Sequence, residues 1–449
     1  MIEDILNSKR NSEEIFIIID DKEISFKEFN HLVDQFDTFI VKTNYSIYRL
    51  AIDLSSKLNT LVALIGCNRL GVVPIIIPPD HRKIQNINYN KIANADHEIR
   101  DNDCIIQIKD DNYNDVKNIN DKNVQCVLFT SGTESIPKAV ELTYNNIYCS
   151  ASNWNRIFNF NNKNYYLNIL PIDHIGGLSI FFRSIYYGFI SVIAEYDKKS
   201  ILTQIQKYDI DYVSVVPKMI SNMIDYEQLK TLGSNIKALI VGGDGIDQYL
   251  HTNLKENNVN AYISYGMTET SSGISGYFIN TLDVFEENFI GIPHSDVEIL
   301  LKDTNIMIKS EVVMARYTDR ADHKNVFLTN DIGKLKNGKI YFISRGSDFI
   351  VSGGENISLT SIRNILNSCS KVVDCVIVGH KDKDWGMVPI VIFESMKNEI
   401  DIDHLIMYCK KNLPKHMMPK HYIKIDKIPY KKNKIDYNLI KFYIKESLA

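Results

Sequence analysis

The stretch LFTSGTESIPKAVELTY, residues 128–144, combines hydroxyl side chains, a glycine and a lysine. The apolar run VQCVLFT leads into it, so we expect the loop to follow a strand, with a helix beginning soon after. Hydroxyl and backbone N–H groups can donate to phosphate oxygens there, and Lys138 adds a cation. Pro137 stands where a P-loop NTPase has the second glycine of GxxxxGKS/T, which excludes that motif. Taken alone, the pattern is equally compatible with a surface turn, because short motifs give many false matches.

A second stretch, SYGMTETSSG, begins at Ser264. Tyr265 offers a flat face for a base, and Gly266 permits a close approach of the backbone. Thr268 can donate to a phosphate, and the carboxylate of Glu269 can hold Mg²⁺, which prefers oxygen ligands. The alternative is an ordinary turn between a strand and a helix, with Thr268 and Glu269 as capping residues.

Three weaker signals follow along the chain. In LTNDIGKL, Asp331 precedes an expected turn and could bind ribose hydroxyls, although such an Asp is more often a turn residue. In SRGSDFIVSGGENIS, Arg345 could reach a ribose or a phosphate, and Gly353 and Gly354 indicate a flexible turn. In KIPYKKNKIDYNLI, Lys434 belongs to a basic segment of a kind that is usually solvated.

Length and composition restrict the class of protein. The chain has 449 residues, of which 45% are hydrophobic and 24% charged, as in soluble globular proteins. A net charge of -4 gives no reason to expect binding to nucleic acid or to a membrane surface. The seven cysteines are scattered without metal-ligand spacing, which indicates reduced thiols in a cytoplasmic protein. The N-terminus lacks the apolar core of a signal peptide, and no apolar run approaches the roughly 18 residues of a membrane span.

Apolar runs and turn residues predict an α/β fold. A hairpin is expected around residues 20–22, and a strand, a helix and a strand follow between residues 48 and 79, the pattern of a parallel sheet. Further short strands end in Gly, Pro, Ser and Thr, where open α/β sheets place their ligands. After about Ile290 the pattern changes to antiparallel strands and then to an α+β arrangement. We therefore expect a large N-terminal domain of parallel and mixed sheets, residues 1–345, and a small α+β C-terminal domain, residues 346–449.

The order of the five stretches resembles that of the adenylate-forming enzymes, which include acyl-CoA synthetases, adenylation domains and luciferases. That family carries TSGTTGxPKG, YGxTE, an Asp in a TGD-like turn, GRxDxxIxxGGENI and a C-terminal GK. Here they stand as TSGTESIPKA, YGMTE, TNDIG, SRGSDFIVSGGENI and KNKID. The resemblance covers nearly the whole chain. It implies ATP and Mg²⁺ as cofactors, coenzyme A as co-substrate, and a C-terminal domain that rotates between two half-reactions.

The resemblance also implies roles for individual residues. Lys434 would bridge the substrate carboxylate and the α-phosphate, and Thr268 and Glu269 would address the α-phosphate and Mg²⁺. The β- and γ-phosphates would be held by Ser131, Thr133 and Lys138, and adenine would be enclosed by Tyr265 and the turn of Gly242, Gly243 and Asp244. Thr130, Gly132 and Gly266 would also belong to the nucleotide site. Asp331 and Arg345 would bind the ribose. Gly353 and Gly354 would line the path of coenzyme A, and Ser347 takes the hinge position.

The stretch LNILPIDHIGGLSIFFRSIYYG is similar to LPxYHISGLSxLFRxxxxG of the bacterial o-succinylbenzoate–CoA ligases. This similarity implies that His174 lies at the acyl pocket, where it would act on the substrate, although a lone His is more often structural. Arg183 is a candidate anchor for a second carboxylate of the substrate, because a bidentate Arg suits that group. An arginine on a helix surface is almost equally compatible. The expected acid is 2-succinylbenzoate, of menaquinone biosynthesis. The alternatives are another acyl- or aryl-CoA ligase, or a degenerate member that binds nucleotide or acyl ligand without catalysis.

Several positions depart from the family pattern. Glu134 and Ser135 replace the usual Thr-Gly, and Glu134 adds negative charge close to the polyphosphate. Asn330, Ser344 and Asn433 replace glycines. The spacing from Pro429 to Lys434 is one residue short, so Lys431 or Lys432 could take the role of Lys434. The sequence leaves the oligomeric state open, a homo-oligomer included.

Overall fold

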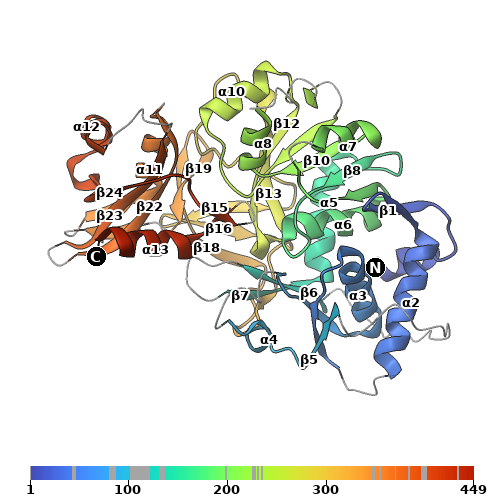
Figure 1. The fold of residues 1–449 in the computed structure, drawn as a ribbon. Helices are drawn as coiled ribbons and strands as arrows, with labels where there is room; N and C mark the ends of the chain where they lie inside the picture. Colours follow the sequence, from blue (N-terminus) through green and yellow to red (C-terminus); the bar gives the residue numbers. More distant parts are fainter. Residues whose placement is uncertain are drawn as a thin grey trace. The chain divides into compact units, whose positions relative to one another are not determined.

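The computed structural model describes residues 2–42, 47–79, 87–101, 122–130, 137–197, 200–224, 229, 232–233, 236–345, 349–352, 355–369, 371–382, 385–395, 402–431 and 434–448. They form two compact units (Figure 1). The N-terminal unit comprises residues 1–299 and 308–327, and the C-terminal unit comprises residues 300–307 and 328–449. The large α/β part and the smaller C-terminal α+β part expected from the sequence are both confirmed.

A nine-stranded mixed sheet, ordered β14-β13-β12-β11-β10-β8-β9-β1-β2, dominates the N-terminal unit. From β12 to β1 all neighbouring strands run parallel, and β2 and β13 add antiparallel partners at either side. Its strands are β1 (Ile15–Ile19), β2 (Lys22–Ser25), β8 (Tyr165–Asn168), β9 (Ile190–Ile193), β10 (Tyr212–Val215), β11 (Ala238–Val241), β12 (Ala261–Met267), β13 (Ser272–Phe278) and β14 (Ile292–Pro293). The predicted hairpin between β1 and β2 is confirmed, with Asp20 and Asp21 at positive φ.

A six-stranded sheet, ordered β17-β7-β6-β4-β3-β5, forms the second layer of this unit. It contains β3 (Arg49–Asp53), β4 (Val73–Ile76), β5 (His97–Arg100), β6 (Val124–Thr130), β7 (Lys138–Thr143) and β17 (Arg316–Tyr317). β6 and β7 pair antiparallel, with Thr130 opposite Lys138. The helix expected after residues 131–136 is confirmed as α5 (Tyr144–Phe158), but strand β7, which the sequence did not predict, comes before it. Residues 131–136 thus join two antiparallel strands, and the helix begins only at Tyr144, after β7.

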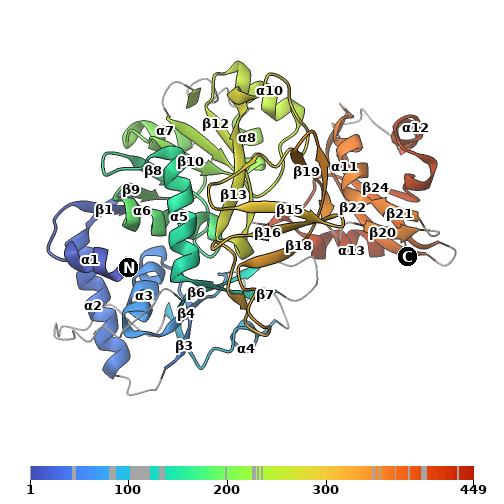
Figure 2. The ribbon, with the colours of Figure 1, turned by 180° about the vertical axis from the view of Figure 1, so that it is seen from behind.

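Helices cover and separate the two sheets. The unit contains α1 (Ile2–Ser8), α2 (Phe26–Lys42), α3 (Lys57–Leu70), α4 (Tyr89–Ile92), α5 (Tyr144–Phe158), α6 (Ile175–Tyr187), α7 (Ile201–Lys207), α8 (Pro217–Ile224), α10 (Gln248–Glu256) and the 3₁₀ turns η3 (Thr268–Thr270) and η4 (Ile279–Thr281). α5 packs against β13 of the larger sheet and against β6 and β7 of the smaller one, and so lies between them (Figure 2). No helix within the described ranges combines the length and apolarity that crossing a bilayer requires.

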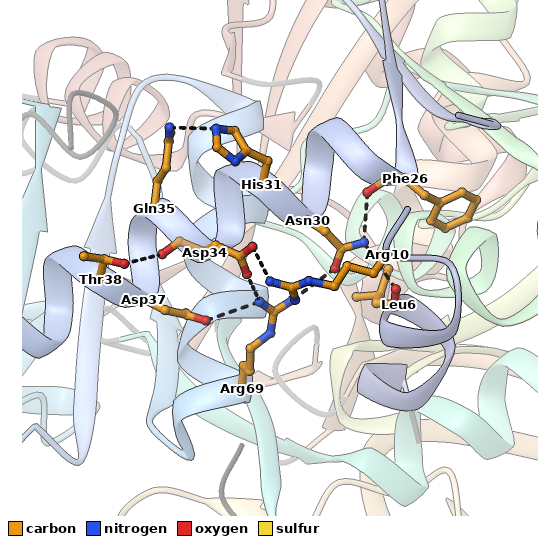
Figure 3. Close-up of polar contacts among 10 residues, drawn as sticks. All are labelled: Leu6, Arg10, Phe26, Asn30, His31, Asp34, Gln35, Asp37, Thr38 and Arg69. Carbon is orange, nitrogen blue, oxygen red and sulfur yellow. Dashed lines mark hydrogen bonds and ion pairs between the residues drawn. The ribbon is translucent and has the colours of Figure 1, made fainter. Parts of the chain in front are cut away.

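A buried charge cluster ties α3 to α2 and to the segment after α1 (Figure 3). The guanidinium of Arg69 lies 2.7 Å from a carboxylate oxygen of Asp34, 3.3 Å from one of Asp37 and 3.1 Å from the amide oxygen of Asn30. Arg10 binds Asp34 from the side nearer the solvent. Asp37 is fully buried, and this burial raises its pKa from 3.8 to about 7 despite the neighbouring Arg69. The cluster therefore depends on Arg69 for its only deeply buried cation.

Arg69→Met is expected to destabilise the protein by about 3 kcal/mol at neutral to alkaline pH, because it leaves buried carboxylates without their cation. The folded protein holds the Asp37 proton more tightly than the unfolded chain does. Stability is therefore lost as the pH rises from 3.8 to about 7, and removal of Arg69 enlarges this loss. Urea unfolding at about pH 5 and pH 8 should show the larger deficit at the higher pH. Arg10→Met, which removes a half-exposed partner, should cost less than about 1 kcal/mol; equal costs for both variants would contradict the assignment.

The C-terminal unit contains a four-stranded sheet, ordered β15-β16-β18-β19, and a five-stranded one built on β21-β20-β23-β22 with β24 paired to β23. Three strands begin or end in the other unit: β15 (Glu298–Lys302), β16 (Asn305–Lys309) and β18 (Val326–Lys336). The other elements are β19 (Lys339–Arg345), β20 (Phe349–Ser352), β21 (Glu355–Ser358), α11 (Leu359–Asn367), β22 (Val372–Asp382), β23 (Gly386–Ser395), α12 (Ile402–Asn412), η6 (Lys415–Met417), β24 (His421–Ile425), β25 (Tyr430–Lys431), β26 (Lys434–Ile435) and α13 (Tyr437–Leu448). The tight turn predicted at residues 336–338 is confirmed, with Asn337 and Gly338 at positive φ.

The contacts along the chain divide it at residues 327 and 328, whereas the sequence predicts a domain boundary at residues 345 and 346. The predicted boundary at residues 345 and 346 stays a prediction. Residues 346–348, which include the expected hinge Ser347, lie outside the described residues. The hinge therefore stays a prediction.

Candidate active site

Several predicted nucleotide-binding residues share one edge of the nine-stranded sheet. Gly242, Gly243 and Asp244 directly follow β11, and Tyr265 and Gly266 lie near the end of the adjacent, parallel strand β12. Gly243 has a φ of 84°, which favours glycine. The connection after β8 leads through α6 to β9 on one side, while β10 lies on the other. Such a reversal of strand order marks the place at which open α/β sheets commonly bind ligands.

The chain after β12 folds back and does not enter an α-helix. A single 3₁₀ turn, η3, is followed by β13, which pairs antiparallel with β12, so the alternative of a strand-to-helix turn is wrong. A Cβ atom at Gly266 would lie 2.1 Å from the carbonyl oxygen of Ser272. The close backbone approach predicted for Gly266 is thus present, and it is to β13.

The η3 turn brings Thr268 and Glu269 against β6 and β7, the two strands that flank residues 131–136. The hydroxyl of Tyr317 donates to a carboxylate oxygen of Glu269 at 2.9 Å. The Nζ atom of Lys138, at the start of β7, lies 5.6 Å from the centroid of the Tyr317 ring. Lys138 and Glu269 thus both contact the side chain of Tyr317. The predicted phosphate-binding residues Ser131, Gly132 and Thr133 lie outside the described residues.

These residues fit a magnesium–nucleotide complex. Glu269 and Thr268 supply carboxylate and hydroxyl oxygens, the hard donors that Mg²⁺ takes together with phosphate oxygens. Both side chains are half-buried and belong to the η3 turn. Lys138 supplies the positive charge that a triphosphate requires. Glu269 would hold the cation, which would neutralise phosphate charge.

Arg183 of α6 is 3% exposed, so the alternative of an arginine on a helix surface is wrong. Its Nη2 atom donates to the hydroxyl oxygen of Ser272 at 2.7 Å, and its Cζ atom lies 4.4 Å from the centroid of the Trp154 ring. Its Nε atom has no hydrogen-bond partner, and no carboxylate forms an ion pair with it, among the residues that the structure describes. Burial lowers the pKa of Arg183 to about 10, a value at which it remains charged at neutral pH.

The neighbours of Arg183 do not supply a counter-charge. The indole N–H of Trp154 donates to the same Ser272 oxygen at 3.1 Å. His294 contacts the Trp154 ring, and burial together with the charge of Arg183 lowers its pKa to about 3, so it is neutral. Sequence reasoning assigned no role to Trp154, Ser272 or His294. Only the position of Ser272 within the SYGMTETSSG stretch gave a signal for any of them.

His174 occupies the position immediately before α6, in the connection that follows β8. Its side chain is 32% exposed, and its Nε2 atom lies 3.9 Å from a carboxylate oxygen of Asp173. Close packing fixes the start of the helix, because a Cβ atom at Gly177 would lie 2.4 Å from the carbonyl oxygen of Pro171. The role of His174 at the acyl pocket stays a prediction.

The remaining predicted residues belong to the C-terminal unit. Asp331 is buried within β18, opposite Arg345 of β19, and its N–H donates to the Thr329 hydroxyl at 3.0 Å. The expectation that Asp331 precedes a turn is wrong, since β18 continues to Lys336. Lys434 begins β26 and pairs with Lys431 of β25. The side chains of Arg345 and Lys434, and residues Gly353 and Gly354, lie outside the described residues.

Comparisons with known proteins agree with this arrangement. The sequence model of the AMP-binding enzyme matches residues 84–317, and that of the AMP-binding enzyme C-terminal domain matches residues 361–434. The 2-succinylbenzoate–CoA ligases of Staphylococcus aureus strains JH9 and MRSA252 are 32% and 31% identical over 321 residues. These matches cover 69% of this chain but only 64% of the length of those relatives.

Two solved structures have the same fold. The o-succinylbenzoate CoA synthetase of Bacillus subtilis, in complex with its acyl-adenylate intermediate, has a TM-score of 0.84 and 24% identity, covering 97% of each chain. ATP-bound MatB from Rhodopseudomonas palustris has a TM-score of 0.85 and 17% identity, covering 100% of this chain and 99% of that one. With the family match spanning more than half of the residues, these findings show that the chain belongs to the family of AMP-binding enzymes.

Proposed function

We propose that this protein is an ATP-dependent acid–CoA ligase that forms an acyl-adenylate and then an acyl-CoA thioester, with 2-succinylbenzoate as its acid. Family membership supports the adenylation chemistry, and the names of the Staphylococcus aureus relatives support the choice of acid. The observation that carries the proposal is the buried guanidinium of Arg183, which contacts Ser272 at the start of β13. This guanidinium has no carboxylate partner among the described residues.

The reaction requires activation because a carboxylate is a poor acyl donor: its charge repels nucleophiles, and oxide is a poor leaving group. Attack of a carboxylate oxygen on the α-phosphate of ATP forms the mixed anhydride and releases pyrophosphate. The thiolate of coenzyme A then attacks the acyl carbon, and AMP leaves. Catalysis of the first step is mainly a matter of positioning and electrostatic stabilisation. Lys138 would bind the triphosphate, Glu269 would hold Mg²⁺, and Lys434 would join the carboxylate to the α-phosphate.

The buried Arg183 favours a substrate acid with two carboxylates over an acid with only one. A buried, uncompensated guanidinium is costly, and a protein retains it when a bound ligand completes the pair. The second carboxylate of 2-succinylbenzoate can accept from the Nε atom, which lacks a partner among the described residues, and form a charge-assisted bond. The ring of Trp154 stacks on the guanidinium and holds it in one orientation.

We propose that residues 346–449 move as one domain between the half-reactions. Lys434 would serve adenylate formation, and Gly353 and Gly354 would line the path of coenzyme A in the second step. The family resemblance supports both roles. The short spacing before Lys434 keeps Lys431 and Lys432 as alternatives, and Lys431 pairs with Lys434 across the β25–β26 hairpin.

Product analysis tests the proposal. Protein incubated with ATP, Mg²⁺, coenzyme A and 2-succinylbenzoate should give AMP, pyrophosphate and a thioester whose mass equals that of 2-succinylbenzoyl-CoA. Another acyl- or aryl-CoA ligase would give a thioester only with a different acid. A degenerate member without catalysis would bind ATP but release no pyrophosphate with any acid of the panel. Such a product would place the protein in menaquinone biosynthesis, and the need for ATP and coenzyme A makes the cytoplasm its expected location.

The double replacement Glu134→Thr and Ser135→Gly is expected to tighten ATP binding by up to about ten-fold, because it removes a negative charge beside the polyphosphate. Calorimetric titration with ATP and Mg²⁺ measures the change. Adenosine, which lacks phosphates, should bind both proteins equally. Unchanged affinity for ATP would mean that the two side chains do not face the phosphates.

A further inference from the structure

Tyr317 lies between two residues of the expected triphosphate site, although it belongs to none of the five stretches quoted from the sequence. Its hydroxyl donates to a carboxylate oxygen of Glu269 at 2.9 Å. The ammonium of Lys138 lies 5.6 Å from the centroid of its ring. The side chain is 6% exposed, so its place is fixed by packing. One tyrosine thus contacts both the expected magnesium ligand and the expected phosphate-binding lysine.

The strand that carries Tyr317 is only two residues long, yet it is held firmly. β17 pairs antiparallel with β7, with Tyr317 opposite Val140 and Arg316 opposite Glu141. Backbone bonds of 3.0 Å on either side, from Ala315 N–H to Glu141 and from Thr318 N–H to Ala139, close the ladder. Because successive side chains of a strand point to opposite faces, Arg316 turns to Glu141 and Tyr317 turns to Glu269.

Glu141 binds β17 on the face to which Arg316 points, opposite to that of Tyr317. Its carboxylate is 1% exposed, and one oxygen accepts from Arg316 Nε at 2.8 Å. The other oxygen accepts from the Thr318 hydroxyl at 3.0 Å and lies 2.9 Å from the guanidinium of Arg49 on β3. Buried, charge-assisted bonds of this kind are strong and directional. Glu141 and Lys138 both belong to β7, which pairs with the strand of Tyr317. Tyr317 and Lys138 are therefore held in fixed positions relative to each other.

We propose that Tyr317 is a positioning residue for magnesium–ATP: its hydroxyl restrains the Glu269 carboxylate in the orientation that binds the cation. This inference rests on the proposed function, in which Glu269 holds Mg²⁺. A ligand carboxylate that is free to rotate must be ordered when the metal binds, and a hydrogen bond from a fixed donor removes that cost. A rigid phenol is suited to this role, because it is neutral and cannot form an ion pair that competes with the metal.

The variant Tyr317→Phe removes only the hydroxyl and keeps the ring beside Lys138. It is expected to weaken ATP binding in the presence of Mg²⁺ by about ten-fold. Binding of ATP in EDTA should be unchanged. KM for magnesium–ATP should rise, whereas the rate of thioester formation from supplied acyl-adenylate, which needs no magnesium–ATP, should stay constant. Calorimetric titrations with ATP plus Mg²⁺ and ATP plus EDTA provide the readout that does not depend on activity.

Tyr208→Phe is the matched control, because it also removes a tyrosine hydroxyl that donates to a carboxylate, but to that of Asp21 at 2.6 Å and not to that of Glu269. It should leave the magnesium dependence of ATP binding unchanged. In a Glu269→Gln protein, Tyr317→Phe should have no further effect on that dependence. Equal loss of ATP binding with and without Mg²⁺, or no loss at all, would overturn the role of Tyr317 while leaving the proposed function intact. If the unaltered protein binds ATP equally with Mg²⁺ and with EDTA, the magnesium role of Glu269 is wrong, and this inference is overturned with it.

Discussion

Arg183→Met is expected to lower kcat/KM for 2-succinylbenzoate by about 10³-fold without any loss of stability of the folded protein. The loss follows from the buried pair that the guanidinium would form with the second carboxylate of the acid. Stability should be unchanged or raised, because the substitution replaces a buried charge, unpaired within the described residues, by an apolar side chain of similar length. Steady-state kinetics and thermal unfolding of the same sample measure the two effects.

Two further variants make this result specific. Arg156→Met removes an exposed arginine of α5 that pairs with Asp296, and it should change neither kcat/KM nor the unfolding temperature appreciably. Arg183→Lys keeps the charge but loses the bidentate geometry, so it should recover only part of the activity. If Arg183→Met lowers kcat/KM equally for 2-succinylbenzoate and for a monocarboxylic acid, Arg183 does not recognise the second carboxylate.

Lys434→Ala is expected to reduce adenylate formation by about 10³-fold, because it removes the cation that stabilises charge developing between the carboxylate and the α-phosphate. Formation of the thioester from supplied acyl-adenylate should be largely retained, since that step uses a different arrangement of the C-terminal domain. Pyrophosphate release and single-turnover thioester formation separate the two half-reactions.

The neighbouring lysine serves as the control. Lys431→Ala should leave both half-reactions unchanged if Lys434 has the catalytic role. The opposite pattern, with Lys434→Ala active and Lys431→Ala inactive in adenylation, would transfer the role to Lys431. Survival of both half-reactions in both variants would show that neither lysine carries the first step.

The sequence predicted the sheet and most of the elements because the apolar runs are short and clearly bounded. It also placed Gly242, Gly243 and Tyr265 at the carboxyl edge of the parallel strands, where the structure has them. Local patterns were less reliable where tertiary pairing decides the conformation. The Asn-Asp pair at residues 330 and 331 is typical of a turn, yet pairing with β19 holds it in a continuous strand.

The sequence did not reveal which partners the buried polar side chains of the site contact. Arg183 lies in a helix with apolar residues on all sides, a sign of burial, but its contact with Ser272 joins segments 89 residues apart. The bond between Tyr317 and Glu269 spans 48 residues and has no local signal at all. Such contacts arise when separate strands meet, so they become visible only once the sheets are assembled.

The most direct test of the account is acid-dependent exchange of labelled pyrophosphate into ATP, which reports adenylate formation alone. We expect 2-succinylbenzoate to stimulate the exchange strongly, with benzoate and succinate far weaker, and Arg183→Met to abolish the preference for 2-succinylbenzoate. No stimulation by 2-succinylbenzoate in the unaltered protein, together with exchange driven by a monocarboxylic acid, would contradict the assignment of this chain as a 2-succinylbenzoate-activating ligase.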